Sequence, residues 1–251
     1  MGMIRRKIDL QNIQMHHRQQ AFTLVELLVV ISIILIASSI IFLGGTGGDG
    51  AKLSSSQRII SGIAQGARGQ AILKSADTRL IIYSDDAGNA DNEKKLRFFG
   101  IVYWGNDVDA SGNVIATGWK AATQGTYLPE GIYFNEDLSR DSTGGNIPTM
   151  NLSYPRLSAT ENDDRVDGGG EEQYYFYEFQ SNGTMATSSP ETKSTDFMNS
   201  WLVLQAGTLK PGSGQELEVD FSEEENVNLK TALIFRRTGT TTPVNDPSDI
   251  N

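Results

Sequence analysis

The feature that most constrains this chain is an uninterrupted apolar run near its N-terminus, at residues 22–43. It reads FTLVELLVVISIILIASSIIFL and contains no Pro, no Gly and a single charged residue, Glu26. A helix of 22 residues spans about 33 Å, the thickness of the hydrocarbon core of a bilayer. A helix in a soluble core would show a polar face at helical spacing, whereas only Ser32, Ser38 and Ser39 interrupt this run. The run therefore predicts a membrane-spanning helix.

Charge is distributed unevenly on the two sides of this run. Residues 1–21 have a net charge of +3, which leaves −13 for the rest of a chain whose total is −10; the charged residues of this leader are Arg5, Arg6, Lys7 and Arg18 against Asp9. Basic flanks stay in the cytoplasm, so we expect one membrane pass with the N-terminus cytoplasmic and the acidic body across the membrane. An acidic body also disfavours nucleic acid as a partner, because that affinity comes from clustered cations.

Glu26 is costly at this position, because a carboxylate inside a membrane helix costs on the order of 3 kcal/mol. Either its side chain reaches the membrane interface, or a partner compensates the charge. The sequence QAFTLVELLVV at residues 20–30 resembles the N-terminal signal of type IV pilins and type II secretion pseudopilins. The resemblance implies that a prepilin peptidase cleaves between Ala21 and Phe22 and methylates the new amine. Ala21 stands where the family usually has Gly, so we expect slower cleavage.

The resemblance also implies an assembly role for Phe22 and Glu26. The new α-amine has an ordinary pKa of about 8 and is mostly cationic at neutral pH. In a filament, the amine on Phe22 of one subunit can pair with Glu26 of its neighbour, which compensates two charges that are costly in lipid. The implied partners are the prepilin peptidase, other pilin or pseudopilin subunits, an inner-membrane assembly platform and membrane lipid. The implied location is the inner membrane, with a periplasmic head, and then a pilus or pseudopilus.

The rest of the chain predicts an α+β head of the pilin type. Residues 44–50, GGTGGDG, predict a flexible joint, because glycine does not hold a stiff helix. Small apolar residues at helical spacing predict an amphipathic helix over residues 51–76. A period of two follows and predicts an antiparallel β head over residues 77–237. We expect strands at residues 78–83, 96–104, 114–120, 131–134, 173–180, 201–205, 216–221 and 231–236.

Three segments of the head carry narrower predictions. Residues 161–172 and the tail at residues 238–251 have little apolar content, which predicts mobility. The Asn182–Gly183 pair predicts a hairpin turn, and the order of helix, long strands and this hairpin resembles the H-type minor pseudopilins. The strand at residues 174–179 carries aromatic residues on both faces. One face is expected in the core, and the other either there or in a contact between subunits.

The composition disfavours an enzyme. The chain has no Cys, and its two His residues, His16 and His17, lie in the leader. Removal of the leader would leave a chain without His or Cys, so a Ser-His-Asp triad, a Cys-His pair and a zinc site with His ligands would each lack an essential residue. The glycine-rich joint formally contains G-x-G-x-x-G, but it does not follow a buried strand, so no nucleotide site is predicted. We expect no catalytic residues, no cofactor and no metal.

Three polar clusters resemble binding sites, and each has a simpler structural interpretation. Residues 107–114 resemble the first half of a calcium loop, but Gly118 stands where a bidentate carboxylate is needed, so a hairpin turn is predicted. A second acidic loop is expected to be solvated; it comprises Asp85, Asp86, Asn89, Asp91 and Glu93. The densest cations lie near Tyr103 and Trp104; these cations are Lys94, Lys95, Arg97, Arg236 and Arg237. A DNA-binding or surface-binding minor pilin would use such a patch, whereas solvated strand ends are the simpler interpretation.

The first prediction is that the mature protein begins at a methylated Phe22. The measurement is intact mass together with N-terminal sequencing of the membrane fraction. Ala21→Gly should speed processing and Ala21→Leu should block it, because the peptidase accepts a small residue before the cut. A mature chain that starts at Met1, or after residue 43, would contradict the family resemblance.

Overall fold

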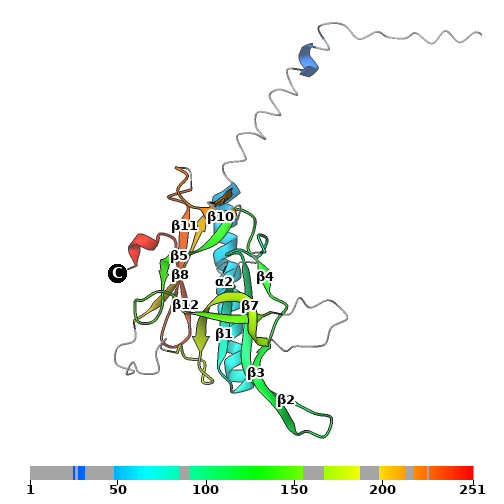
Figure 1. Ribbon diagram of the computed structural model, residues 1–251. Helices are drawn as coiled ribbons and strands as arrows, with labels where there is room; N and C mark the ends of the chain where they lie inside the picture. Colours follow the sequence, from blue (N-terminus) through cyan, green and yellow to red (C-terminus); the bar gives the residue numbers. More distant parts are fainter. Residues whose placement is uncertain are drawn as a thin grey trace, which may run out of the picture. The chain divides into compact units, whose positions relative to one another are not determined.

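The computed structural model describes residues 25, 28–31, 48–84, 91–154, 167–186, 198–212, 217–224 and 226–250 (Figure 1). The chain divides into two compact units, residues 1–46 and 47–251. In the first unit, Val25 and residues 28–31 are helical, and their side chains are exposed. Among the described residues, no helix combines the length and apolar character needed to cross a membrane. The leader and most of the predicted membrane segment lie outside the described residues, as do Ala21, Phe22 and Glu26.

The head begins with one long helix, α2 (Gly48–Lys74). It starts three residues earlier than predicted, so the glycine-rich joint is partly helical, and Asp49 lies in its first turn, where a negative charge favours the helix dipole. Ser75 has a positive φ of 50° and ends the helix in the left-handed conformation. The buried stripe consists mostly of small side chains; its members are Leu53, Ser56, Ile60, Ala64, Ala67 and Ala71. This stripe lets the strands approach the helix closely.

All strand pairings of the head are antiparallel in the described part of the chain, which confirms the α+β class. The eight predicted strands are present; β1 has the predicted ends and the other seven have shifted ends, and four more strands were missed: β4, β6, β9 and β12. The elements are β1 (Thr78–Tyr83), β2 (Phe98–Val108), β3 (Val114–Ala121), β4 (Thr126–Tyr127), β5 (Ile132–Arg140), β6 (Thr149–Ser153), β7 (Asp167–Phe179), β8 (Ser200–Ala206), β9 (Thr208–Pro211), β10 (Leu217–Asp220), β11 (Lys230–Phe235), β12 (Thr241–Val244) and a short 3-10 helix, η1 (Pro247–Asp249).

The strands form three sheets. The largest has the order β3-β2-β1-β7-β6, with β4 beside β2; the second has the order β12-β11-β8-β5, and β9 pairs with β10. In Figure 1, β5, β8, β11 and β12 lie on one side of α2, and β2, β3 and β4 lie on the other. The helix contacts both large sheets. The alternation of residues shows which face of a strand is apolar, but it does not show which strand lies beside it.

Two hydrophobic cores share the six-stranded sheet. The first lies between α2 and the two large sheets and includes the fully buried Phe99, Phe134, Phe179 and Phe235. The second lies on the opposite face of the six-stranded sheet; its buried members are Ile81, Tyr83, Phe98, Val102, Ala121, Leu152, Tyr154 and Tyr174. Both faces of β7 are therefore packed within the head, which explains the aromatic residues on its two faces.

Parts of the two segments predicted to be mobile form strands where they are described. Residues 167–172 form the first part of β7, and β12 in the tail pairs with β11. Polar side chains of α2 hold this tail: Gln57 Nε2 donates to the Val244 carbonyl at 3.1 Å and Ser61 Oγ contacts Thr241 Oγ1 at 3.2 Å. The sequence analysis relied on the low apolar content of the tail, so it missed a strand that hydrogen bonds to α2 hold in place.

The second prediction contrasts two glycines of the head. Gly239 has a φ of +74°, and a Cβ there would collide with the Gly183 carbonyl oxygen, so Gly239→Ala should lower the free energy of unfolding by about 2–4 kcal/mol. Gly62 lies within α2, and a Cβ there would meet nothing within 4 Å. Gly62→Ala should therefore raise the free energy of unfolding by about 0.5–1 kcal/mol.

The measurement is urea unfolding of the full-length chain in detergent micelles. The three tryptophans all lie in the head and report its unfolding by fluorescence. Equal effects of the two substitutions would contradict the backbone geometry described here.

Candidate functional site

A row of three aromatic rings and one guanidinium lies on the face of the six-stranded sheet that points away from α2. Arg79 of β1 lies between two rings, with its Cζ 4.2 Å from the Trp119 centroid and 3.9 Å from the Phe176 centroid. Trp119 in turn contacts Trp104 edge to face, with centroids 5.3 Å apart. Cation–π stacking of this kind stabilises each pair by about 0.5–2 kcal/mol. We call these four residues the Arg79 ladder.

Arg79 also pairs with Glu178 of β7. Arg79 Nε donates to Glu178 Oε2 at 2.5 Å, and Arg79 Nη1 lies 3.3 Å from the Met150 sulfur. Both charged side chains are about one fifth exposed, so the pair is only partly screened by water. Adjacent strands place them opposite each other, because Arg79 and Glu178 are direct partners in the register of β1 and β7. The ion pair with Glu178 therefore helps to orient the Arg79 side chain that is stacked between Trp119 and Phe176.

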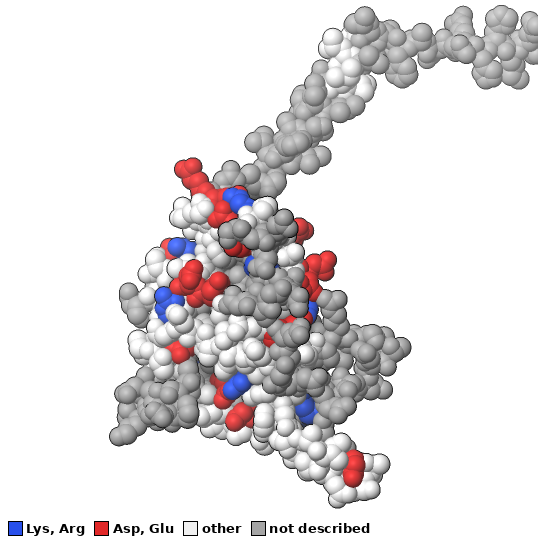
Figure 2. All heavy atoms as spheres, in the orientation of Figure 1, with Lys and Arg blue, Asp and Glu red and all other residues white. Residues whose placement is uncertain are grey.

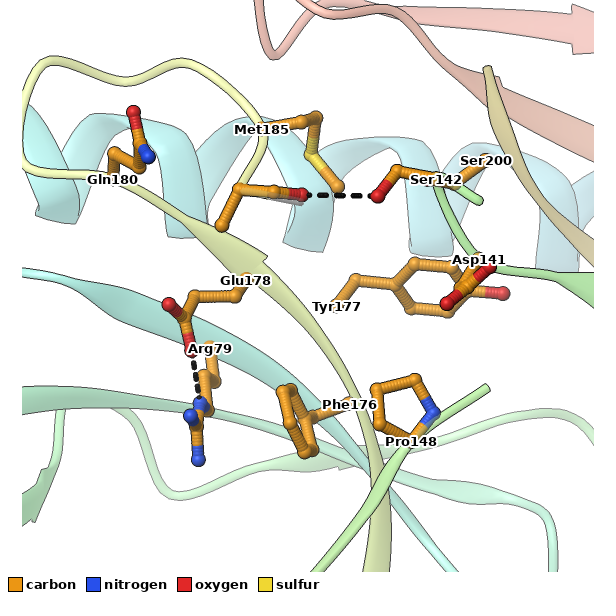
Figure 3. A pocket seen from close by; sticks show the side chains of 11 residues that line it. Arg79, Asp141, Ser142, Pro148, Phe176, Tyr177, Glu178, Gln180, Met185 and Ser200 are labelled. Carbon is orange, nitrogen blue, oxygen red and sulfur yellow. Dashed lines mark hydrogen bonds and ion pairs between the residues drawn. The ribbon is translucent and has the colours of Figure 1, made fainter. Parts of the chain in front are cut away.

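A cavity of about 450 Å³ opens beside this pair (Figure 3). Arg79, Phe176 and Glu178 form one wall, and Met185 and Ala186 form another. Further lining residues come from the start of β6 and β8 and from the turn after β5; they are Asp141, Ser142, Pro148 and Ser200. Its volume lies within the range of small-ligand pockets. The cavity is thus bounded by segments from both large sheets.

The buried end of this cavity holds a carboxylate and a phenol. Asp141 is buried, and its Oδ1 accepts hydrogen bonds at 2.8 Å from the backbone N–H and hydroxyl of Thr143 and from the N–H of Gly145. Tyr177 donates its hydroxyl to the Trp201 carbonyl at 2.9 Å. Burial raises the pKa of Tyr177 well above its ordinary value, and the negative charge of Asp141 raises this pKa further. Tyr177 therefore stays neutral at physiological pH.

The five cations grouped in the sequence separate in the structure: Lys94, Lys95 and Arg97 make contacts within the head, whereas Arg236 and Arg237 are exposed just after β11. Lys94 and Lys95 are buried. Lys94 Nζ donates to Glu172 Oε1 at 2.6 Å, and Lys95 Nζ donates to the Leu217 carbonyl. Arg97 donates to the Leu128 carbonyl at 2.9 Å. The sequence could not show that these amines turn inward, because the acceptors lie far away along the chain.

The face of the head that Figure 2 shows carries no basic patch over the described residues. Lys and Arg atoms lie singly there, with Asp and Glu atoms among them. Tyr103 and Trp104, which lie near the lysines in sequence, sit on β2 instead, with Lys74 of α2 over the Tyr103 ring at 5.1 Å. The sequence cluster is therefore not a surface cluster.

The loop at residues 107–114 forms the hairpin turn between β2 and β3. Asp109 Oδ1 accepts hydrogen bonds from the N–H groups of Ser111 and Asn113, each at 2.8 Å, and Asp109 Oδ2 accepts from the Asn113 amide at 3.1 Å. The hydrogen bonds from the Asn113 backbone and then its side chain lower the pKa of Asp109 below its ordinary value. Both oxygens of Asp109 thus serve the turn.

The second acidic loop is described only from Asp91 onward. The Asp91 carbonyl accepts hydrogen bonds from the N–H groups of Lys94 and Lys95, which forms a tight turn. Asp85, Asp86 and Asn89 lie outside the described residues. Within the described ranges, no group of three or more acidic or histidine side chains is arranged to hold a metal ion.

Of three comparisons with known proteins, one identifies a motif in the N-terminal segment. Residues 16–42 match the family model of the prokaryotic N-terminal methylation motif. No curated protein matches the chain. One solved structure, the type IV minor pilin FimU of Pseudomonas aeruginosa, is 12% identical and covers 79% of this chain and 92% of its own, with a TM-score of 0.33. This similarity is too low to carry an argument about the site.

The motif match confirms the resemblance seen in the sequence. The match covers the N-terminal segment, where residues 20–30 resemble the signal of type IV pilins and pseudopilins. The match ends at residue 42, so the narrower resemblance to H-type minor pseudopilins stays a prediction. The Arg79 ladder and its cavity lie in the head, and the sequence analysis missed both. The only signal was a charged residue in an otherwise apolar strand, TRLIIY.

The third prediction concerns the buried amine of Lys94. Lys94→Gln should lower the free energy of unfolding by about 2 kcal/mol, because it removes a charge partner of Glu172 and leaves a poorly solvated carboxylate. The matched control is Arg236→Gln, which alters an exposed cation of the same sequence cluster and should change the free energy by less than about 0.5 kcal/mol.

Urea unfolding followed by tryptophan fluorescence measures both variants. If Lys94→Gln were as mild as Arg236→Gln, the lysine would be a surface cation after all, and a basic patch would have to be considered again.

Proposed function

We propose that this chain is a prepilin-like structural subunit of a type II secretion pseudopilus or a type IV pilus. The single observation that carries the proposal is the match of residues 16–42 to the N-terminal methylation motif. The family is structural, and its members act by assembling into filaments. The work of this subunit would then be mechanical, since subunits added at the base extend or push a filament.

Processing would occur at the membrane before assembly. A prepilin peptidase would cleave between Ala21 and Phe22 and methylate the new amine on Phe22. Residues 22–43 would hold the subunit in the inner membrane, with the acidic head on the periplasmic side. The inner-membrane assembly platform would then transfer the subunit into the filament.

Assembly would depend on the pairing of two charges in lipid. The methylated amine of Phe22 stays cationic, and Glu26 of the neighbouring stem is the carboxylate nearest to it in sequence. Each charge alone is costly in the hydrocarbon core, whereas the pair is compensated. The pairing would also set the axial position of one stem against the next.

The alternative function is a minor pilin whose head binds DNA or a surface. Two observations count against DNA. The chain outside the leader carries a net charge of −13, and Lys94 and Lys95 are buried in contacts within the head. Non-specific DNA binding needs exposed cations that displace counterions from phosphates. The structural subunit is therefore the better-supported function.

The fourth prediction concerns Glu26. Glu26→Leu should still be processed and should remain in the membrane, because its partner amine forms only after cleavage and the substitution removes a costly carboxylate. Incorporation into filaments should fall at least tenfold, which corresponds to about 1.4 kcal/mol of lost pairing. Shearing of filaments combined with membrane fractionation measures both pools.

The matched control is Ser32→Leu, which makes the same kind of polar-to-apolar change in the apolar run without removing a charge. It should leave incorporation near the wild-type level. Equal incorporation of wild type and Glu26→Leu into filaments would rule out the pairing mechanism. Loss of processing would show that the peptidase recognises Glu26.

A further inference from the structure

The last strand of the chain, β12, covers one edge of the four-stranded sheet. The strand order of this sheet is β12-β11-β8-β5, and β12 pairs with residues 232–235 of β11. Just beyond the paired residues, the Arg236 N–H donates to the Thr240 carbonyl at 2.8 Å. β11 therefore lies between β8, which belongs to the centre of the sheet, and a short strand near the C-terminus.

The N–H groups of β11 point alternately to these two neighbours. Because the Arg236 N–H points to the β12 side, every second residue before it does the same. On the other side, the Ala206 N–H at the end of β8 donates to the Leu229 carbonyl at 2.9 Å, which fixes the opposite set. The N–H groups that face β12 are those of Ala232 and Ile234, and those that face β8 are those of Leu233 and Phe235.

The two strands differ in how they tolerate an open edge. Pro243 of β12 is exposed and has no N–H, and by the same alternation its nitrogen points away from β11. A proline at this place hinders pairing with a further strand. β11 reads KTALIF, with four consecutive apolar residues, one lysine and no proline or acidic residue. Without β12, its N–H and carbonyl groups would offer an edge that pairs with other chains.

Polar contacts hold β12 against α2. Gln57 Nε2 donates to the carbonyls of Ala232 and Val244 at 3.0 and 3.1 Å, and Gln65 Nε2 donates to Thr241 Oγ1 at 3.0 Å. In the described part of the chain, neither hydrophobic core includes a side chain of β12. Water can replace such hydrogen bonds, so their net contribution is small, whereas apolar burial holds β11. β12 is thus held less firmly than β11.

The turn before β12 is held by separate contacts. Arg68 Nε donates to the Gly183 and Thr238 carbonyls at 3.2 and 3.1 Å. The Met185 N–H donates to the Arg237 carbonyl at 3.0 Å. These contacts do not involve β12, so the chain can open after Thr238 without disturbing either core.

We propose that β12 is a releasable cover of the β11 edge. It opens locally while both cores stay packed, because segments held by few apolar contacts open at a lower free energy than the core. In the closed state it keeps β11 of one copy from pairing with β11 of a second copy. An antiparallel pair of these strands would place the two lysines, each at the start of its strand, at opposite ends, so no like charges would oppose it. The proposal rests on contacts within the head and does not depend on the proposed function.

Amide hydrogen exchange, resolved by residue in the full-length chain in detergent micelles, tests the local opening. After correction for intrinsic rates, Ala232 and Ile234 should exchange at least 100-fold faster than Leu233 and Phe235, because opening of β12 exposes only the first pair. The four amides lie in one strand, so global unfolding affects them alike. Equal protection of the two pairs would overturn the local opening.

Loosening the cover should act on the same two amides. Gln57→Ala should speed exchange at Ala232 and Ile234 at least tenfold and at Leu233 less than threefold, since it removes the donor that joins α2 to both strands. The matched control is Ser55→Ala, which also introduces alanine into α2 but at an exposed position, and it should change neither rate. Equal acceleration at Leu233 would show that Gln57 stabilises the whole head and would overturn the cover.

A disulfide tests the protective role. The chain has no Cys, and Ile234 and Thr242 are direct partners, so Ile234→Cys with Thr242→Cys provides one lock between β11 and β12. In the Gln57→Ala background, oxidation should slow exchange at Ala232 to the rate of Leu233. Failure of the disulfide to form within one chain would contradict the pairing of β12 with β11.

Sedimentation in micelles then compares the oxidised and reduced forms of this variant at rising protein concentration. The reduced form, kept in a reducing agent, should associate at least tenfold more strongly, because only its β11 edge can open. Association through the stems is the same in both forms and cancels in the comparison. Equal association of the two forms would overturn the role of β12 in keeping two copies apart.

Discussion

The head depends on the close packing of one helix stripe against two sheets. Ala64, Ala67 and Ala71 of α2 are fully buried, and their small size lets β1 and β2 of one sheet and β8 and β11 of the other lie against the same helix. Large residues then come from the strands, such as Phe99 and Phe235. Truncation of such a buried ring costs about 3–5 kcal/mol. The large side chains of the core thus come mainly from the strands, and the small side chains of α2 let the strands approach the helix closely.

The second core follows from the first, because a sheet that packs on α2 with one face still has another face to cover. The head covers it with its own aromatic residues: Tyr154 lies against the six-stranded sheet at Gly100, where a Cβ would approach the Tyr154 ring to 2.9 Å. Lys94, Glu172 and Tyr174 continue this layer as hydrogen-bonded polar groups. This face of the sheet therefore carries both the buried second core and the partly exposed Arg79 ladder.

Much of the fold could be predicted from periodicity, whereas partners across the sheets could not. The helix and eight strands were foreseen because their apolar residues recur at periods of 3.6 and 2. β12 was missed because TTPV has little apolar content, and its order comes from Gln57 and Ser61 on α2. The burial of Lys94 and Lys95 was missed for the same reason, since Glu172 and the Leu217 carbonyl are distant in sequence. The cavity depends on Pro148 lying beside Phe176, a relation that no local pattern encodes.

The charge of the head limits which neighbours it can pack against. Heads of this kind placed side by side would bring two acidic bodies within the screening distance of about 8 Å at physiological salt, where like charges still repel. The apolar stem offers no compensation for that repulsion, because its one charge, Glu26, is expected to pair within the membrane. Under the proposed function, neighbouring heads would therefore pack most favourably where their acidic side chains face away from each other, and the attraction between subunits would come mainly from the stems.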